Sequence, residues 1–230
     1  MRMRRRLFAL LGLLLVCAGP VVAQVAPSPS DVQAYEGLHK AAWRGDVASL
    51  NAQLKAGADT NARDGHGRTP LHVATFAQHG DVIRALAQAG ANLDAMEDER
   101  YDAVTIASVA NDPVTLRTLL SLGASARQIT SRYDGTALIA ASHLGHDEVV
   151  RQLVAAGAPL DHVNNLHWTA VIEAIVLGDG GPAHQRTLTL LAKAGANLRL
   201  TDREGNTPLQ LATMRGYTAM VATLKAAGAR

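Results

Sequence analysis

The sequence predicts an all-α repeat solenoid of about six stacked units, on the strength of three observations. The triplet Ala-Gly-Ala recurs along the chain, and Leu122-Gly123-Ala124 fills the one gap in the series. The glycines are spaced 33, 33, 34, 38 and 33 residues apart, at Gly57, Gly90, Gly123, Gly157, Gly195 and Gly228. A fixed period of about 20–50 residues marks stacked supersecondary units rather than one closed globule. Only 3% of the 230 residues are aromatic although 48% are hydrophobic, which suits thin helices packed closely together.

The first 23 residues have the three parts of a cleavable signal peptide. Arg2 to Arg6 supply positive charge, the apolar run 7–16 follows, and Val21-Val22-Ala23 forms the cleavage site. The apolar run is shorter than the roughly 20 residues that a membrane-spanning helix needs. We therefore expect residues 1–23 to be removed on export to the bacterial periplasm, with no membrane attachment afterwards. Lipidation at Cys17 is the alternative, although Val16 is bulkier than the residue that a lipidation motif has at that point.

The charge balance without this leader argues against a nucleic-acid partner. Four of the 22 basic residues lie in the leader, which leaves 18 basic against 20 acidic residues and a formal charge of −2. No basic run remains, so the electrostatic footprint of a nucleic-acid-binding protein is missing. Cleavage after Ala23 would also leave a chain without cysteine, which neither needs nor risks disulfides in an oxidising compartment.

After the leader, a short linker is expected to precede one repeat domain. Residues 24–31 are rich in Pro and Ser and lack apolar periodicity, so we expect a flexible linker there. The repeat domain is expected to span 32–230. Its units have the approximate boundaries 32–65, 66–98, 99–131, 132–165, 166–203 and 204–230.

Each unit shows two short helical patterns separated by a turn. In the fourth unit the apolar run 137–141 predicts a first helix and 144–147 a turn, while apolar residues at helical spacing over 149–154 predict a second helix. Gly157 is expected to end that second helix, because the left-handed position after a helix strains any residue with a Cβ.

A six-residue motif at the start of the first helix identifies the kind of repeat. It reads Thr-Pro-Leu-His-Val-Ala at 69–74 and Thr-Pro-Leu-Gln-Leu-Ala at 207–212, with weaker forms at 37–41, 136–141 and 169–174. In this motif Thr caps the helix and Pro occupies the position whose N–H has no partner. The chain resembles the ankyrin repeat family from about residue 32 to 230. The resemblance implies helix–turn–helix units with projecting β-hairpin loops, at 64–67 and 202–205 among others.

Two units depart from this pattern. The third has Arg100-Tyr101-Asp102-Ala103 in place of the motif, and its second helix is expected to open at Asp112-Pro113. The fifth carries extra residues over 178–183, which should lengthen the turn between its helices. That insertion is either a tolerated loop, since loop length is thermodynamically cheap, or a contact with a partner.

Residues that could carry chemistry are present but not arranged for it. The nine histidines show no close pair with a third metal ligand nearby, and no catalytic or phosphate-binding motif occurs. His39 and His72 fall on the motif histidine, which the ankyrin resemblance implies is structural and bonds a neighbouring hairpin backbone. We therefore expect no enzyme activity, no cofactor and no metal. A hydrolase or metal protein is the alternative that metal analysis would test.

The ankyrin resemblance places five of the seven aromatic residues after the leader on one concave face, at hairpin tips and late in the first helices. Aromatic anchors flanked by cationic side chains are typical of binding hot spots. For Tyr101 and Trp168 the competing interpretation is packing between neighbouring repeats. The candidate protein-binding residues are Trp43, Arg44, His66, Arg68, Phe76, Tyr101, Tyr133, His143, Trp168, Met214 and Arg215.

The sequence thus predicts a non-catalytic protein-interaction scaffold in the periplasm that binds a protein through its concave face. A rigid row of repeats holds such a face in place, so little conformational entropy is lost on binding. An inhibitor or immunity-type protein that occludes a periplasmic enzyme or toxin would use the same surface and stays open as the alternative. A monomer is expected, with weak self-association near Leu224 conceivable.

Overall fold

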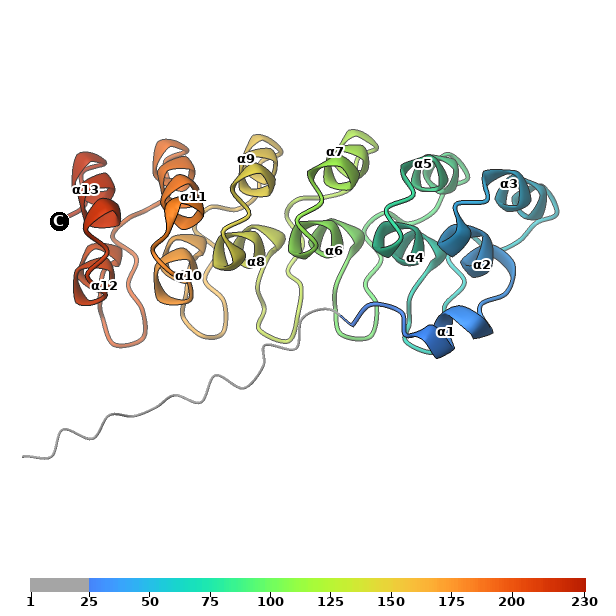
Figure 1. Ribbon diagram of the computed structural model, residues 1–230, viewed down its shortest axis with the longest axis horizontal. Helices are drawn as coiled ribbons and strands as arrows, with labels where there is room; N and C mark the ends of the chain where they lie inside the picture. The colour runs from blue at the N-terminus through green and yellow to red at the C-terminus, as the bar shows by residue number, and fades with distance from the viewer. Residues whose placement is uncertain (1–24) are drawn as a thin grey trace, which may run out of the picture.

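The computed structural model describes residues 25–230 and shows six helix pairs stacked in a single row, preceded by the short helix α1 (Pro29–Ala34) (Figure 1). The expected signal peptide, Cys17 and Gln24 lie outside the described residues. The first helices of the pairs are α2 (Gly37–Arg44), α4 (Pro70–Phe76), α6 (Ala103–Val109), α8 (Ala137–Leu144), α10 (Ala170–Val176) and α12 (Pro208–Met214). The second helices are α3 (Val47–Lys55), α5 (Gly80–Gln88), α7 (Pro113–Ser121), α9 (Asp147–Ala155), α11 (Pro182–Lys193) and α13 (Thr218–Ala226).

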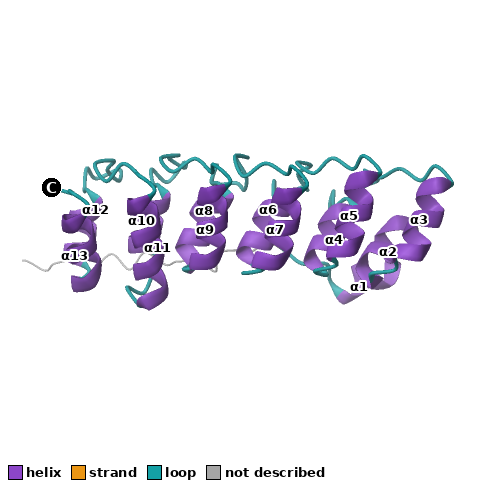
Figure 2. Cartoon of the chain, turned by 90° about the horizontal axis from the view of Figure 1, so that it is seen from above, coloured by secondary structure: helices purple, strands orange, loops and turns teal. Residues whose placement is uncertain are grey.

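The helices form two parallel rows. Each first helix packs against the first helices of its neighbours, and each second helix against the neighbouring second helices. We call the two rows the inner row (α2 to α12) and the outer row (α3 to α13). The loops that join one unit to the next lie along one edge of the helices and extend past the inner row (Figures 1 and 2). The prediction of an all-helical solenoid of about six units is confirmed.

Local sequence explains where the helices begin and end. The inner helices α8, α10 and α12 are capped by the hydroxyl groups of Thr136, Thr169 and Thr207. Helix α6 is capped by the carboxylate of Asp102, whose Oδ1 accepts a hydrogen bond from the Thr105 N–H at 2.7 Å. The predicted opening of α7 at Asp112-Pro113 is also confirmed. Gly157 follows α9 with φ of +79°, the left-handed conformation expected where a helix ends in glycine.

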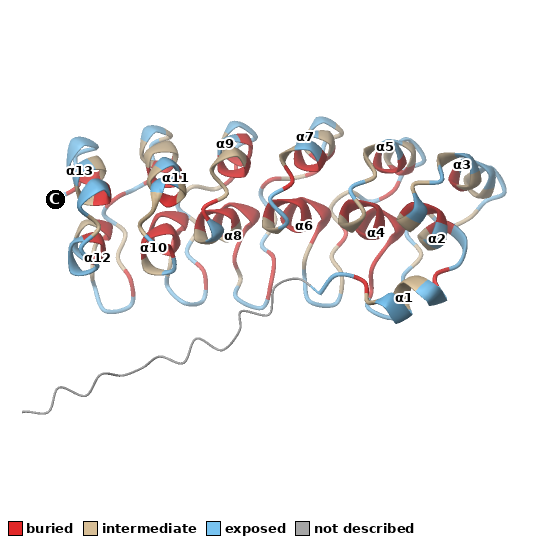
Figure 3. Ribbon diagram, viewed as in Figure 1, coloured by how far each residue is buried: buried red, intermediate tan, exposed pale blue. Residues whose placement is uncertain are grey.

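A continuous core of small aliphatic side chains lies between the two rows (Figure 3). Helix faces toward neighbouring units carry alanine, such as Ala74, Ala107 and Ala141, and allow close approach of the helices. Larger side chains such as Leu138 and Leu153 fill the space between rows. No unit could bury this surface alone, so each unit depends on its neighbours for stability.

The loops before the inner helices are tight turns rather than β-hairpins. Two backbone hydrogen bonds close the first of them, from Asp64 N to Arg68 O at 3.0 Å and from Gly67 N to Asp64 O at 3.1 Å. Residues 25–230 contain no β-strand, only an isolated bridge between Thr130 and Gly135. The predicted hairpin loops are therefore present as turns without a regular pair of strands. Successive loops are nevertheless joined, because Asp98 N donates to His66 O at 3.2 Å and equivalent bonds follow down the row.

Histidines connect the inner helices to the loops of the next unit. His39 Nε2 donates to Arg68 O and His72 Nε2 to Ala95 O, both at 2.9 Å. Nδ1 of His72 accepts from the Thr69 N–H at 3.0 Å, so both ring nitrogens have partners and the ring is neutral. The structural role predicted for these two histidines is confirmed.

Replacing His72 by Gln is expected to remove a loss of stability on the acid side of the pH profile. Burial lowers the pKa of His72 to about 4, below the ordinary value of 6.5. As pH falls, the unfolded chain therefore binds a proton at His72 before the folded protein does. The contribution of the buried neutral ring to stability is complete above pH 6.5 and is lost as pH falls to 4. At pH 7 the free energy of unfolding of the variant should be about 1 kcal/mol lower, because the hydrogen bond to the Ala95 carbonyl is lost. Between pH 7 and pH 5, urea titrations should show a fall in its free energy of unfolding that is about 2 kcal/mol smaller than that of the wild type. Equal losses in both proteins would contradict this account.

The N-terminal segment is folded where a flexible linker was expected. Helix α1 begins at Pro29, and Ser28 and Asp31 cap it reciprocally through their side chains and backbone N–H groups. The Pro- and Ser-rich composition that suggested a linker instead supplies a helix cap and a proline at the first helical turn. The linker prediction is wrong for residues 25–31.

The insertion over 178–183 lengthens the turn between α10 and α11, as predicted. The turn packs against the next unit, because Tyr217 Oη donates to Gly178 O at 2.9 Å. Asp179 Oδ1 lies 2.8 Å from His184 Nδ1. These contacts explain why the insertion is tolerated, while a partner contact there stays a prediction.

Candidate functional site

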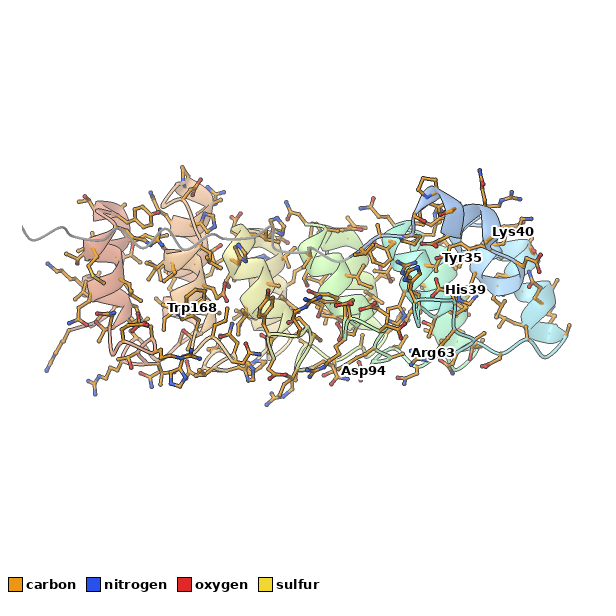
Figure 4. All side chains as sticks on the ribbon, turned by 90° about the horizontal axis from the view of Figure 1, so that it is seen from below. Tyr35, His39, Lys40, Arg63, Asp94 and Trp168 are labelled. Atoms are coloured by element: carbon orange, nitrogen blue, oxygen red, sulfur yellow. The ribbon has the colours of Figure 1, made fainter. Side chains whose placement is uncertain are left out.

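The candidate site is the face formed by the exposed sides of the inner-row helices and by the loops that precede them, which we call the inner face. Figure 4 looks onto this face, with Trp168 near the boundary between helices and loops. It corresponds to the surface that the sequence predicts to be concave.

Most predicted binding residues lie on this face at repeating positions. Trp43, Phe76, His143 and Met214 stand at or next to the last residue of an inner helix, with Arg44 and Arg215 directly beside two of them. His66, Tyr101, Tyr133 and Trp168 belong to the loops. The stacking of units therefore brings these residues into two lines along the row.

The predicted anchors differ in how much surface they offer. Trp43 and Trp168 are partly buried and pack against the hydrophobic core, and Tyr101 is half-buried. The competing interpretation of packing between repeats thus holds for part of each of these side chains. Tyr133 and Met214 are exposed.

Arg68 does not belong to a free binding surface, and its prediction is wrong. Its residue surface is 1% exposed, because the N-terminal segment folds over it. The guanidinium donates to Asp31 Oδ2 at 3.2 Å, to Asp64 Oδ2 at 3.4 Å and to the Val25 carbonyl at 2.9 Å. Arg68 is thus a buried cation that forms ion pairs with two carboxylates and holds residues 25–35 against the first loop.

Other polar groups at this end are likewise partnered. The Ser28 N–H and the Arg68 guanidinium lower the pKa of Asp31 to about 2. Burial and the hydrogen bond that Tyr35 Oη donates to Asp64 raise the pKa of Tyr35 to about 12. A cavity of about 440 Å³ adjoins these side chains and His66, whose Nε2 lies 3.5 Å from Asp31 Oδ1. The N-terminal end of the inner face is thus polar and internally paired.

The C-terminal half of the inner face is exposed and apolar, and sequence reasoning missed part of it. Leu144 and Leu177 are 41% and 40% exposed at the ends of α8 and α10. They occupy the register of Arg44 and Arg215, so the repeat alignment itself could have identified them. Leu166 joins them from a loop tip, beside the predicted Tyr133. Units four to six therefore carry a set of apolar side chains in the two lines described above, which we call the apolar patch: Tyr133, Leu144, Leu166, Trp168, Leu177 and Met214.

Glu173, also missed, lies in α10 between these units. It is the one charged residue in that helix and is 4% exposed. Asn164 Nδ2 donates to its Oε1 at 3.0 Å, and His143 Nδ1 lies 3.8 Å from its Oε2. Burial raises the pKa of Glu173 to about 7 and lowers the pKa of His143, which the nearby His184 and His146 lower further. A charge inside the apolar run 170–176 was the available sequence signal.

Within residues 25–230, no group of three or more His, Cys, Asp or Glu side chains has an arrangement that could hold a metal ion. None of the helices in that range is both long and apolar enough to cross a membrane.

Comparison with known proteins identifies the repeats. The family model for ankyrin repeats in three copies matches residues 38–130, 111–202 and 137–230. The chain is 34% identical over 190 residues to YahD of Escherichia coli K12, described as an ankyrin repeat protein, and the match covers 82% of this chain and 94% of YahD.

Solved structures agree with that match. An ankyrin repeat domain from Acinetobacter baumannii AYE is 42% identical with a TM-score of 0.79, over 84% of this chain and 98% of that one. The ankyrin repeat domain of Bcl-3 is 28% identical with a TM-score of 0.76, over 86% of this chain and 88% of that one. The chain therefore belongs to the ankyrin repeat family.

Proposed function

We propose that this protein is a non-catalytic scaffold that binds a protein partner in the bacterial periplasm through its inner face. Ankyrin repeat proteins typically mediate protein–protein interactions, which supports the general class. The observation that carries the proposal is the apolar patch, because five of its side chains are exposed although the same chain buries other leucines completely. Exposed apolar side chains that gather on one face of a protein mark interaction sites.

The patch has the features of an affinity hot spot. Its residues come from rigid helix ends and from loops that are bonded to one another, as Asn165 N is to Tyr133 O at 3.0 Å. Such a surface needs little ordering when a partner binds, so more of the interaction energy appears as affinity. Tyr133 and Trp168 add aromatic rings, which dominate measured hot spots.

Substitution of the patch tests the binding face. A partner captured from the periplasmic fraction should bind the Trp168→Ala and Leu144→Ala variants more weakly by about 2 kcal/mol at the better site, as measured by titration calorimetry. The matched control is Val114→Ala, since Val114 is 68% exposed on the outer-row helix α7. Affinities that change no more in the patch variants than in the control would refute binding through this face.

Export is supported by the leader-like residues 2–23 and has its own test. When cells are fractionated, the protein should be found in the periplasm, and its mass should be that of a chain that begins at Gln24. A cytoplasmic protein of full-length mass would exclude this part of the proposal.

A further inference from the structure

The negative charge of Glu173 does not stabilise the fold at the position that this residue occupies. It lies in an inner-row helix whose other residues, Ala170 to Ile172 and Ala174 to Val176, are apolar. Taking a carboxylate out of water is unfavourable unless it is paired. No Lys or Arg within residues 25–230 forms an ion pair with it.

One carboxylate oxygen of Glu173 is held and the other is free. Oε1 accepts the hydrogen bond from Asn164. Oε2 accepts no hydrogen bond from the described residues, yet it is not among their fully enclosed polar atoms without a partner. It therefore keeps a small opening to the surface. His143, whose Nδ1 lies 3.8 Å from this oxygen, has a side chain that is 24% exposed.

The opening belongs to the apolar patch. Asn164 links Glu173 to the surface, because its Oδ1 also accepts the backbone N–H groups of Leu166 at 3.0 Å and Trp168 at 2.9 Å. Leu144 directly follows His143 in α8. Glu173 is thus connected to the apolar patch on two sides, to Leu166 and Trp168 through Asn164 and to Leu144 through its chain neighbour His143.

We propose that this part of the inner face binds a lysine or arginine side chain of the protein partner, with the cationic group on Glu173 Oε2 and the aliphatic stem against the apolar patch. The inference rests on the proposed function and specifies the chemistry of the partner. A carboxylate that is buried and lacks a cation is complementary to such a side chain, because the charge pair replaces the water that Glu173 has lost. The apolar rim suits the methylene stem, and Trp168 and Tyr133 offer ring faces to the cation.

The surroundings of Glu173 predict that acid weakens this binding. Its pKa of about 7 means that the carboxyl must lose a proton to pair with a cation, and acid also charges His143 beside it. Among the helices packed against α10, α12 has no titratable residue, α8 contributes His143, and α11 contributes His184, Arg186 and Lys193. His184 and Arg186 already contact Asp179 and Asp147. Affinity for a basic segment should therefore rise about tenfold from pH 6 to pH 8.

The test uses a random peptide library displayed on phage and selected on the purified chain. Selected peptides that compete with one another and lose affinity for Leu144→Ala should contain Lys or Arg next to apolar residues. Their affinity should fall about 30-fold for Glu173→Gln, which keeps the shape and the acceptor for Asn164. It should not change for Glu148→Gln, the same substitution at a position on outer-row α9 whose side chain is 44% exposed. Thermal unfolding verifies that each variant is folded.

The outcomes separate the two proposals. Peptides that depend on Leu144 but bind Glu173→Gln as tightly as the wild type, or that lack basic residues, overturn the cation site and leave the binding face standing. Peptides that do not depend on the apolar patch, or the absence of any selected peptide, count against both proposals. Affinity that is independent of pH between 6 and 8 also overturns the role of Glu173.

Discussion

Replacing Arg68 by Ala is expected to lower the free energy of unfolding by about 3 kcal/mol. The substitution leaves two carboxylates, Asp31 and Asp64, facing each other without their shared cation, and it frees the carbonyl of Val25. Removing one partner of a buried ion pair costs about 3–5 kcal/mol, and the lower end applies because the Asp31 side chain is 22% exposed. For a chain of this size the melting temperature should fall by about 6–12 °C.

A matched arginine distinguishes this effect from the loss of any ion pair. Arg84 pairs with Asp81 at 2.8 Å on the surface, with side chains 50% and 80% exposed, so Arg84→Ala should change stability by about 0–1 kcal/mol. Hydrogen exchange adds a second readout, since residues 25–35 should lose protection in Arg68→Ala alone. Equal melting temperatures for the two variants would mean that the N-terminal segment contributes nothing to the fold.

Local sequence signals were sufficient for the repeats themselves. Gly157 ends a helix because of its own backbone freedom, and Thr207 begins one because its hydroxyl accepts the N–H of Gln210, three residues on. Such signals act within one unit and recur in the next, so the periodic sequence predicts helices, turns and their stacking. The 178–183 insertion could be located for the same reason.

The state of Arg68 could not be predicted in this way. Its partner Asp31 is 37 residues away, in a segment whose Pro and Ser content is typical of linkers. The position before the helix cap is occupied by Tyr101 and Trp168 in other units, and the sequence predicts that Arg68 is a cationic neighbour of such aromatic anchors. Whether a polar segment folds over such a position depends on ion pairing in three dimensions, and no periodicity reports it.

Glu173 shows the same limit at the candidate site. The repeat motif places it in an inner helix, but its meaning depends on two neighbours from elsewhere, Asn164 in the preceding loop and His143 in the previous unit. Neither contact follows from helical spacing. The repeat pattern therefore predicts the candidate face and several of its aromatic residues but not the ionisable group beside them.

Replacing Glu173 by Gln is expected to stabilise the protein by about 3 kcal/mol at pH 8 and to change little below pH 4.5. Burial raises the pKa of Glu173 from 4.5 to about 7, so the folded protein holds a proton that the unfolded chain has released. The stabilising contribution of the neutral carboxyl is complete below pH 4.5 and is lost as pH rises through 7. Gln keeps the bond from Asn164 and never ionises. Urea unfolding at pH 4.5, 6 and 8 measures the difference.

The wild-type profile should be flatter than that of either single variant, because His72 and Glu173 oppose each other. His72 reduces stability as pH falls below 6.5, and Glu173 reduces it as pH rises above 4.5. Glu173→Gln should therefore expose the acid loss due to His72, whereas Glu148→Gln should leave the profile close to that of the wild type. A Glu173→Gln protein no more stable than the wild type at pH 8 would mean that the carboxylate is solvated or paired in the folded state. A stabilised variant with weaker binding of basic peptides would instead show that this carboxyl reduces stability and serves recognition.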